Sequence, residues 1–84
     1  MIVETLNSTY VFDMDSDPKT VTRYTHWGPE LRRDDETLEF IGFNIPPKVG
    51  ERMQMVIIVR EDVPDAVVFT VRTTTEVTSI KEDQ

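Results

Sequence analysis

Apolar residues recur at every second position in several short stretches of the chain, and this spacing predicts β-strands rather than helices. The clearest stretch is 8–14, in which Tyr10, Phe12 and Met14 alternate with other residues and are expected to point inward. A turn should follow, because residues 15–19 are rich in aspartate, serine and proline, which favour turns. The N-terminal residues 2–7 form either a short lead-in strand or a frayed arm.

The most apolar stretch is 53–60, which contains four consecutive β-branched residues, Val56 to Val59. Such residues are stiff at χ1 and fit a pleated sheet better than a helix. Because this stretch is apolar on both faces, we expect a central strand that is covered on both sides.

Further strands are predicted at 20–26, 37–43, 66–72 and 73–80. The stretches 20–26 and 73–80 are rich in threonine and poor in aliphatic residues, so we place them at sheet edges, where a charged Arg23 would resist aggregation. In 37–43 the neighbouring Phe40 and Ile41 imply either contact on both faces or a bulge, for which Gly42 is the natural site.

These strands, with no convincing helix, predict an all-β fold, a small antiparallel sandwich or barrel of five to six strands. Residues 1–80 should form a single domain, and residues 81–84 a disordered tail. The expected core is apolar and drawn from five of the predicted strands: Tyr10, Phe12, Val21, Leu38, Phe40, Met55, Ile57, Val59, Val67, Phe69 and Val71.

Charge and composition narrow the classes of function. The chain has 84 residues and a net charge of −7, which disfavours binding to phosphate backbones and to anionic membranes. With no cysteine and one histidine, a disulfide, a thiolate zinc site and a histidine metal cage are all disfavoured. The N-terminal residues do not resemble a signal peptide, so a cytoplasmic location is expected.

Two motifs carry candidate chemistry of their own. Residues 13–17 have the D-x-D-x-D spacing that opens a calcium loop, but Pro18 and Tyr24 stand where that loop needs glycine and a bidentate glutamate. An acidic hairpin turn is therefore the favoured interpretation, with weak cation binding as the alternative. Residues 45–50, with two consecutive prolines, are interpreted as a rigid crossover into the central strand.

The best candidate for a contact surface is the segment 24–33. Tryptophan and arginine are enriched at interface hot spots, and this segment combines aromatic and cationic residues beside a Gly-Pro turn. The expected interface residues are Tyr24, His26, Trp27, Arg32 and Arg33. The structural alternative is that Trp27 caps one end of the barrel with His26 at its rim.

Three patches carry a resemblance to a known group of proteins: Ser8–Tyr10 followed by Val21–Arg23, then Leu31–Asp34, and finally Pro47–Met53. Their order and spacing resemble small uncharacterised β-rich proteins of actinobacteria and their phages. That group brings no known activity, cofactor or catalytic residue, so the resemblance implies no site. It implies that a phage could encode the chain.

Three hypotheses for function follow. The leading one is a non-enzymatic protein–protein interaction or assembly module, without cofactor, that forms a homodimer or binds a partner through an edge strand. The alternative is an acidic inhibitor that mimics DNA and captures a basic nucleic-acid-binding protein. The third is a small hydrolase or ligand-binding barrel, motivated by His26 near carboxylates.

Overall fold

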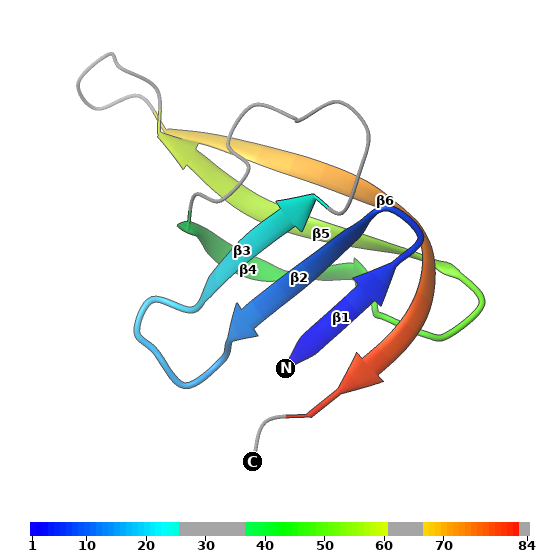
Figure 1. Cartoon of the computed structure of the whole chain (residues 1–84). Helices are drawn as coiled ribbons and strands as arrows, with labels where there is room; N and C mark the ends of the chain where they lie inside the picture. Colours follow the sequence, from blue (N-terminus) through cyan, green and yellow to red (C-terminus); the bar gives the residue numbers. More distant parts are fainter. Residues whose placement is uncertain (26–36, 61–66, 83–84) are drawn as a thin grey trace.

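The computed structural model describes residues 1–25, 37–60 and 67–82, and places six strands in one antiparallel sheet (Figure 1). In chain order these are β1 (Ile2–Thr5), β2 (Ser8–Asp13), β3 (Thr20–Thr25), β4 (Thr37–Ile45), β5 (Arg52–Arg60) and β6 (Val67–Lys81). Each strand pairs with the next along the chain, and β6 pairs with β1, so the sheet closes into a barrel. The all-β prediction is confirmed, and of its two alternatives the barrel is the observed one.

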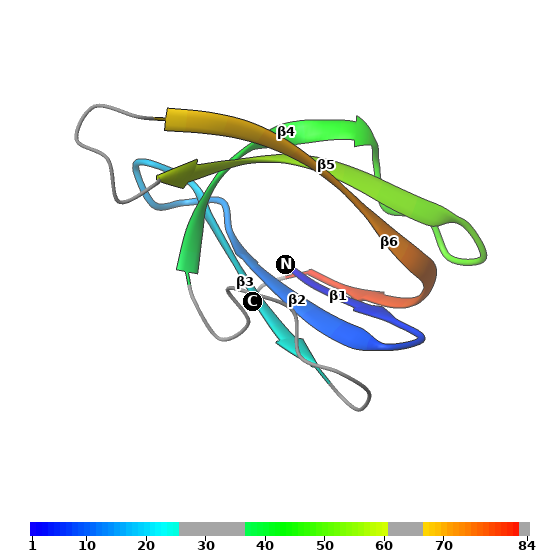
Figure 2. The same cartoon turned by 90° about the horizontal axis from the view of Figure 1, so that it is seen from above.

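The barrel is flattened into two layers (Figure 2). β4, β5 and the N-terminal part of β6 form one layer, and β1, β2 and β3 form the other. The C-terminal part of β6 crosses from the first layer to the second and lies beside β1. The two layers therefore share one interior, and each has an outer face directed away from it.

β6 is the strand that closes the sheet. Its first part pairs with β5 from Val67 to Glu76, and its last part pairs with β1 from Val77 to Lys81. The sequence predicts two separate strands here, 66–72 and 73–80, which is wrong, because one bent strand of 15 residues serves both neighbours. Lys81, expected in a disordered tail, is the last residue of this strand.

The two expected edge strands each have two neighbouring strands in the closed order, but these neighbours do not pair along their whole length. β3 pairs with β2 along Thr20–Thr25 but with β4 only at Thr20–Thr22, and β6 pairs with β5 along Val67–Glu76 and with β1 along Val77–Lys81. Threonine is placed here because its β-branched side chain suits a strand, whether or not the strand is at an edge. Pairing of such strands between two copies stays a prediction.

The loop between β4 and β5 holds the bend of β6. The Gly50 N–H donates to the Val77 carbonyl at 2.9 Å, and the Val77 N–H donates to the Glu51 carbonyl at 2.8 Å. Gly50 has a φ of 91°, in the left-handed region that side chains disfavour. The glycine thus lets the predicted rigid crossover turn tightly enough to reach β6.

The core lies between the two layers. Eight of the eleven predicted core residues are buried, namely Tyr10, Phe12, Val21, Leu38, Phe40, Met55, Ile57 and Val59. The sequence missed Val3, Met53 and Val77, which are at most 1% exposed. Phe69 and Val71 were predicted to be buried, which is wrong, because they are 66% and 53% exposed. The side chain of Val67 is outside the described residues.

A bulge in β4 brings a second aromatic ring into this core. The pairing with β5 shifts between Phe40 and Gly42, as the sequence predicts for Gly42. Without the shift Phe43 would point to the opposite side from Phe40, as the alternation implied. With it, the Phe43 ring lies 4.8 Å from that of Phe40 and 5.3 Å from that of Phe12. Ile41 is left on the outer side, 50% exposed.

β5 lies between β4 and β6 in the barrel wall, and only one of its two faces is buried. Met53, Met55, Ile57 and Val59 point into the barrel and are buried, whereas Val56 and Ile58 alternate with them on the outer side. A closed barrel has a single interior, so the second apolar face of the strand can be covered only from outside. The expected burial of this strand on both faces is therefore corrected to burial on one.

This arrangement predicts different losses of stability for two substitutions. Ile57→Ala should lower the free energy of unfolding by about 2–5 kcal/mol, because it removes fully buried atoms and leaves a cavity. Phe69→Ala should change it by less than about 1 kcal/mol, because the ring is mostly in solvent. Urea unfolding followed by circular dichroism measures both. Equal losses for the two variants would show that β6 has the opposite face inward.

Candidate functional site

The candidate site is an apolar patch on the outer face of the β4–β5–β6 layer. It comprises Ile41 from β4, Val56 and Ile58 from β5, and Phe69 and Val71 from β6. We call this set the outer apolar face. In Figure 2 its layer runs along the top of the view, with the outer side turned away from β1, β2 and β3.

The strand register makes these side chains contiguous. Val56 lies opposite Val71, and Ile58 lies opposite Phe69. Directly opposite residues have Cβ atoms about 4.5–5.5 Å apart, and residues two apart in one strand share a face. Ile41 precedes Gly42, which is the β4 partner of Val56. The patch therefore continues across three adjacent strands without a polar side chain between its members in this register.

Exposure is highest on the two flanking strands. Phe69 is 66% exposed, Val71 53% and Ile41 50%, whereas Val56 and Ile58 in the middle strand are half-buried by these neighbours. Single apolar residues on a surface are ordinary, but a contiguous group of them across a sheet is typical of a binding surface.

Polar side chains bound this patch along one side. The Asn44 amide donates to Gln54 Oε1 at 3.1 Å, and the Gln54 amide donates to Thr73 Oγ1 at 2.9 Å. These three residues form a hydrogen-bonded row across β4, β5 and β6. On the opposite side Glu39 pairs with Ile58 in the register. The row fixes the side chains at this border, so the patch has a defined limit.

The outer face of the other layer differs in character. Its outward positions on β2 and β3 include Thr9, Val11, Thr22 and Tyr24, which the register places together. Thr22 and Thr37 share a hydrogen bond of 2.9 Å between their hydroxyls. Val11 lies opposite Ile2 of β1, but threonines at positions 9 and 22 separate it from Tyr24, so the apolar positions on this layer are interrupted.

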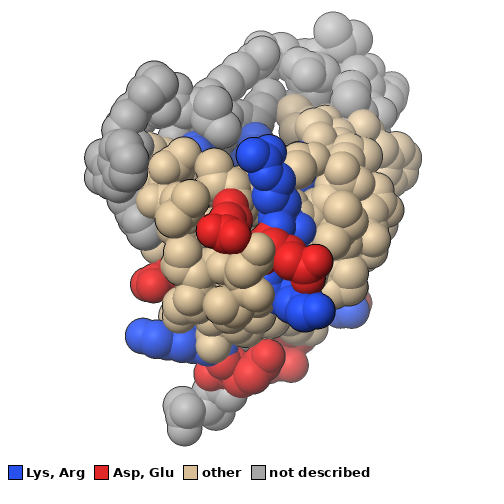
Figure 3. All heavy atoms as spheres, turned by 90° about the vertical axis from the view of Figure 1, so that its right-hand side faces the viewer, with Lys and Arg blue, Asp and Glu red and all other residues tan. Residues whose placement is uncertain are grey.

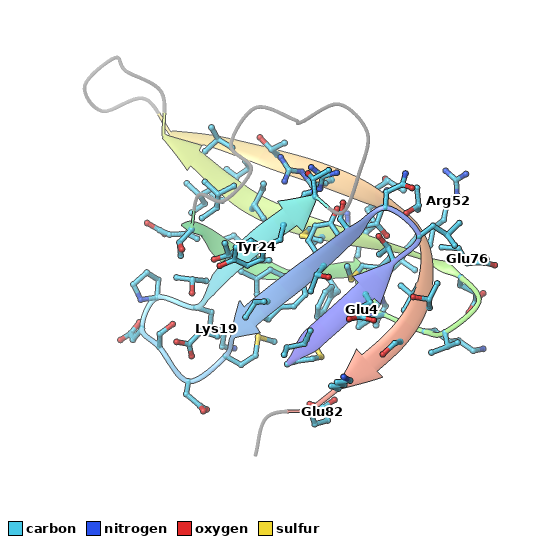
Figure 4. All side chains as sticks on the ribbon, in the orientation of Figure 1. Glu4, Lys19, Tyr24, Arg52, Glu76 and Glu82 are labelled. Atoms are coloured by element: carbon cyan, nitrogen blue, oxygen red, sulfur yellow. The ribbon has the colours of Figure 1, made fainter. Side chains whose placement is uncertain are left out.

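Of the interface residues predicted from the sequence, the structure describes Tyr24. It lies on β3, 46% exposed, and is therefore on the layer opposite the outer apolar face; Figure 4 shows it on that strand. His26, Trp27, Arg32 and Arg33 lie outside the described residues, as does the His26 site of the hydrolase hypothesis.

Arg23, expected to project from an edge strand, instead points into the barrel and is 9% exposed. Its Nε donates to the Tyr10 hydroxyl at 3.3 Å, and its Nη1 donates to Thr25 Oγ1 at 3.0 Å. A buried guanidinium needs such acceptors, because it loses its hydration on burial. Alternation in β3 puts Arg23 on the same face as Val21, which the sequence had already assigned to the core.

The acidic motif at 13–17 forms a hairpin turn, as favoured. Asp13 Oδ1 accepts hydrogen bonds from the backbone N–H groups of Asp15 and Ser16, at 3.2 Å and 3.1 Å. This carboxylate therefore stabilises the turn itself. Across the part of the chain that the structure describes, no three histidine, cysteine, aspartate or glutamate side chains are grouped so as to hold a metal ion.

Sequence reasoning missed the outer apolar face because it assigned Phe69 and Val71 to the core. The sequence did carry a signal. Two neighbouring strands that are each apolar on both faces have more apolar side chains than one barrel interior can bury. The described residues contain no helix with the length and apolarity needed to cross a bilayer. Comparison of the chain with family models, curated proteins and solved structures finds no match.

The Arg23 contacts generate a prediction for stability. Tyr10→Phe should lower the free energy of unfolding by about 1–3 kcal/mol, because a buried charged donor loses its acceptor. Tyr24→Phe is the matched control, since that ring is partly in solvent, and it should change stability by less than about 0.5 kcal/mol. Chemical denaturation of both variants tests this, and an unchanged Tyr10→Phe would mean that the hydroxyl is not needed by Arg23.

Proposed function

We propose that this chain is a non-enzymatic protein–protein interaction module that binds its partner through the outer apolar face. The observation that carries the proposal is Phe69, which is 66% exposed on β6, opposite Ile58 and on the same face as Val71. Completing the burial of such a ring in an interface is worth about 1–2 kcal/mol, a large share of what one side chain contributes.

The strand pairing bears on how a partner can bind. β6 pairs with β5 along Val67–Glu76 and with β1 along Val77–Lys81, so each part of this strand has one of these two neighbours and not both. The outward side chains of a layer remain available, and their apolar character favours a partner surface that is itself apolar. We therefore favour binding by packing of one face on another, and edge-strand pairing stays the alternative.

The acidic-inhibitor alternative depends on carboxylates that gather on one face. On the face shown in Figure 3, acidic and basic side chains are interspersed. The register there places Arg52 opposite Glu76, which Figure 4 shows at the same end of the barrel, and Lys48 lies 3.5 Å from Glu51. A mixed surface of this kind supports solubility rather than imitation of a phosphate backbone, so we favour the interaction module.

The proposal predicts where cross-links form in cells. Replacing Phe69 by a photoreactive phenylalanine analogue should give adducts with protein on illumination, because the outer apolar face is occupied. The same replacement at Val49, 58% exposed in the loop between β4 and β5, is the control and should give few adducts. Mass spectrometry identifies each cross-linked protein.

A third position tests the competing surface. Adducts at position 24 with none at position 69 would assign the contact to the segment 24–33 and would contradict the proposal. Adducts of equal yield at positions 69 and 49 would indicate collision with abundant proteins, and would also contradict it.

A further inference from the structure

We infer that the free side of β6 at Val67–Thr73 binds an extended segment of a partner protein, which adds one strand to the sheet and places a carboxylate beside Arg72. We call residues 67–73 of β6 the open edge. The inference goes beyond the proposed function, because it uses backbone groups of β6 in addition to outward side chains. The two contacts are compatible, since a strand bound there would continue the β4–β5–β6 layer.

The strand register leaves one side of the open edge unpaired. Each of its seven residues has a partner on β5. β1 pairs with β6 along Val77–Lys81, and Figure 1 shows it beside that last part of the strand. Among the described residues, none pairs with the other side of the open edge. Because N–H and C=O groups of alternate residues point to opposite sides of a strand, about half of those in the open edge point away from β5.

The open edge lies just beyond the point where β1 stops. The Leu6 N–H donates to the Glu76 carbonyl at 3.1 Å, and the chain then turns into β2. A segment bound at the open edge would therefore lie end to end with β1. At about 3.4 Å per residue the open edge offers roughly 24 Å of backbone, and an extended polypeptide is the ligand whose N–H and C=O groups match that spacing.

The sequence of the open edge does little to prevent such pairing. Proteins commonly protect an edge with proline, with several charges or by keeping the strand very short. The open edge reads V-V-F-T-V-R-T, which contains no proline and a single charge, that of Arg72. A composition of this kind is typical of a strand that pairs with another chain.

Arg72 sets the chemistry of the incoming segment. It lies opposite Met55, which is 1% exposed, so its side chain is on the inward side of β6, where it is half-buried. In the part of the chain that the structure describes, it forms no hydrogen bond or ion pair. A partly buried guanidinium is stabilised by a carboxylate, which can accept two parallel hydrogen bonds from it. We therefore expect aspartate or glutamate on the incoming strand, opposite Arg72.

The residues on either side of that carboxylate need the opposite character. Phe69 and Val71 point outward, and side chains of an added strand that share this face would lie beside them, so these should be apolar. The net charge of −7 disfavours further carboxylates, and it also disfavours a second copy of the chain as the occupant. The segment is thus extended, with one acidic residue between apolar ones and with any other charges positive.

A synthetic peptide of sequence K-V-T-V-E-V-T-V-K has these properties and serves as the probe. Titrated into the isotope-labelled chain, it should shift the amide NMR signals of the open edge. We expect a Kd between about 10 µM and 1 mM, because ordering a flexible peptide offsets much of the gain from pairing. Replacing its glutamate by glutamine should weaken binding by up to about fivefold.

Hydrogen exchange distinguishes strand pairing from packing on the outer apolar face. In the free chain, alternate amides of the open edge should exchange rapidly, because they face away from β5. With the peptide at ten times its Kd, exchange at these amides should slow by about tenfold. Shifted signals without this alternate protection would mean that the peptide packs through its side chains, and would contradict the inference.

Arg72→Gln tests the carboxylate. This variant should bind the glutamate and glutamine peptides equally. Arg52→Gln makes the same change of net charge at an exposed position of β5, labelled in Figure 4, and should keep the preference for glutamate. Circular dichroism verifies the fold of each variant. If Arg72→Gln is unfolded, the two peptides are compared on the wild-type chain, where equal affinity would refute the pairing with Arg72.

Three further results would overturn the inference. One is no change at the open edge up to millimolar peptide, and another is slow exchange of all its amides in the free chain. The third is a chain that dimerises and then takes up no peptide, which would assign the edge to a second copy. If the peptide does not bind while position 69 cross-links to a protein, the proposed function stands and the inference fails. If the peptide binds and position 69 gives no cross-link, the reverse holds.

Discussion

The pairing of β1 with the C-terminal part of β6 is the constraint on which the rest of the structure depends. Four residues of β1 meet the end of a 15-residue strand, and this contact turns an open sheet into a barrel. The bend that makes it possible is held by hydrogen bonds from the β4–β5 loop to Val77. Closure satisfies the backbone groups of β1 and of the C-terminal part of β6, which would otherwise be edges.

Closure also decides which apolar side chains are buried. A barrel of six strands has a single interior, and here it is filled by the rings of Phe12, Phe40 and Phe43 together with Ile57 and its inward neighbours. The alternating residues of β5 and β6 must then lie outside, even where they are apolar. The outer apolar face is thus a direct result of placing two strands that are apolar on both sides in a wall with one interior.

The same constraint shapes the proposed association. Because the interior is already filled, the apolar outer side of the β4–β5–β6 layer remains exposed and available for contact. The threonine-rich outer positions of β2 and β3 offer no comparable apolar area.

The sequence by itself determined most of the strand positions, the acidic turn at 13–17, the bulge at Gly42 and most of the core, because alternation and turn residues act locally. It could not determine which face of β6 points inward, since Val67, Phe69 and Val71 alternate with Val68, and both faces are compatible with burial. That choice came from the register with β5, which places Thr70 opposite the buried Ile57. Likewise, the threonine-rich stretch 73–80 suggested an edge, but only pairing between residues far apart in sequence decided that the end of β6 lies beside β1.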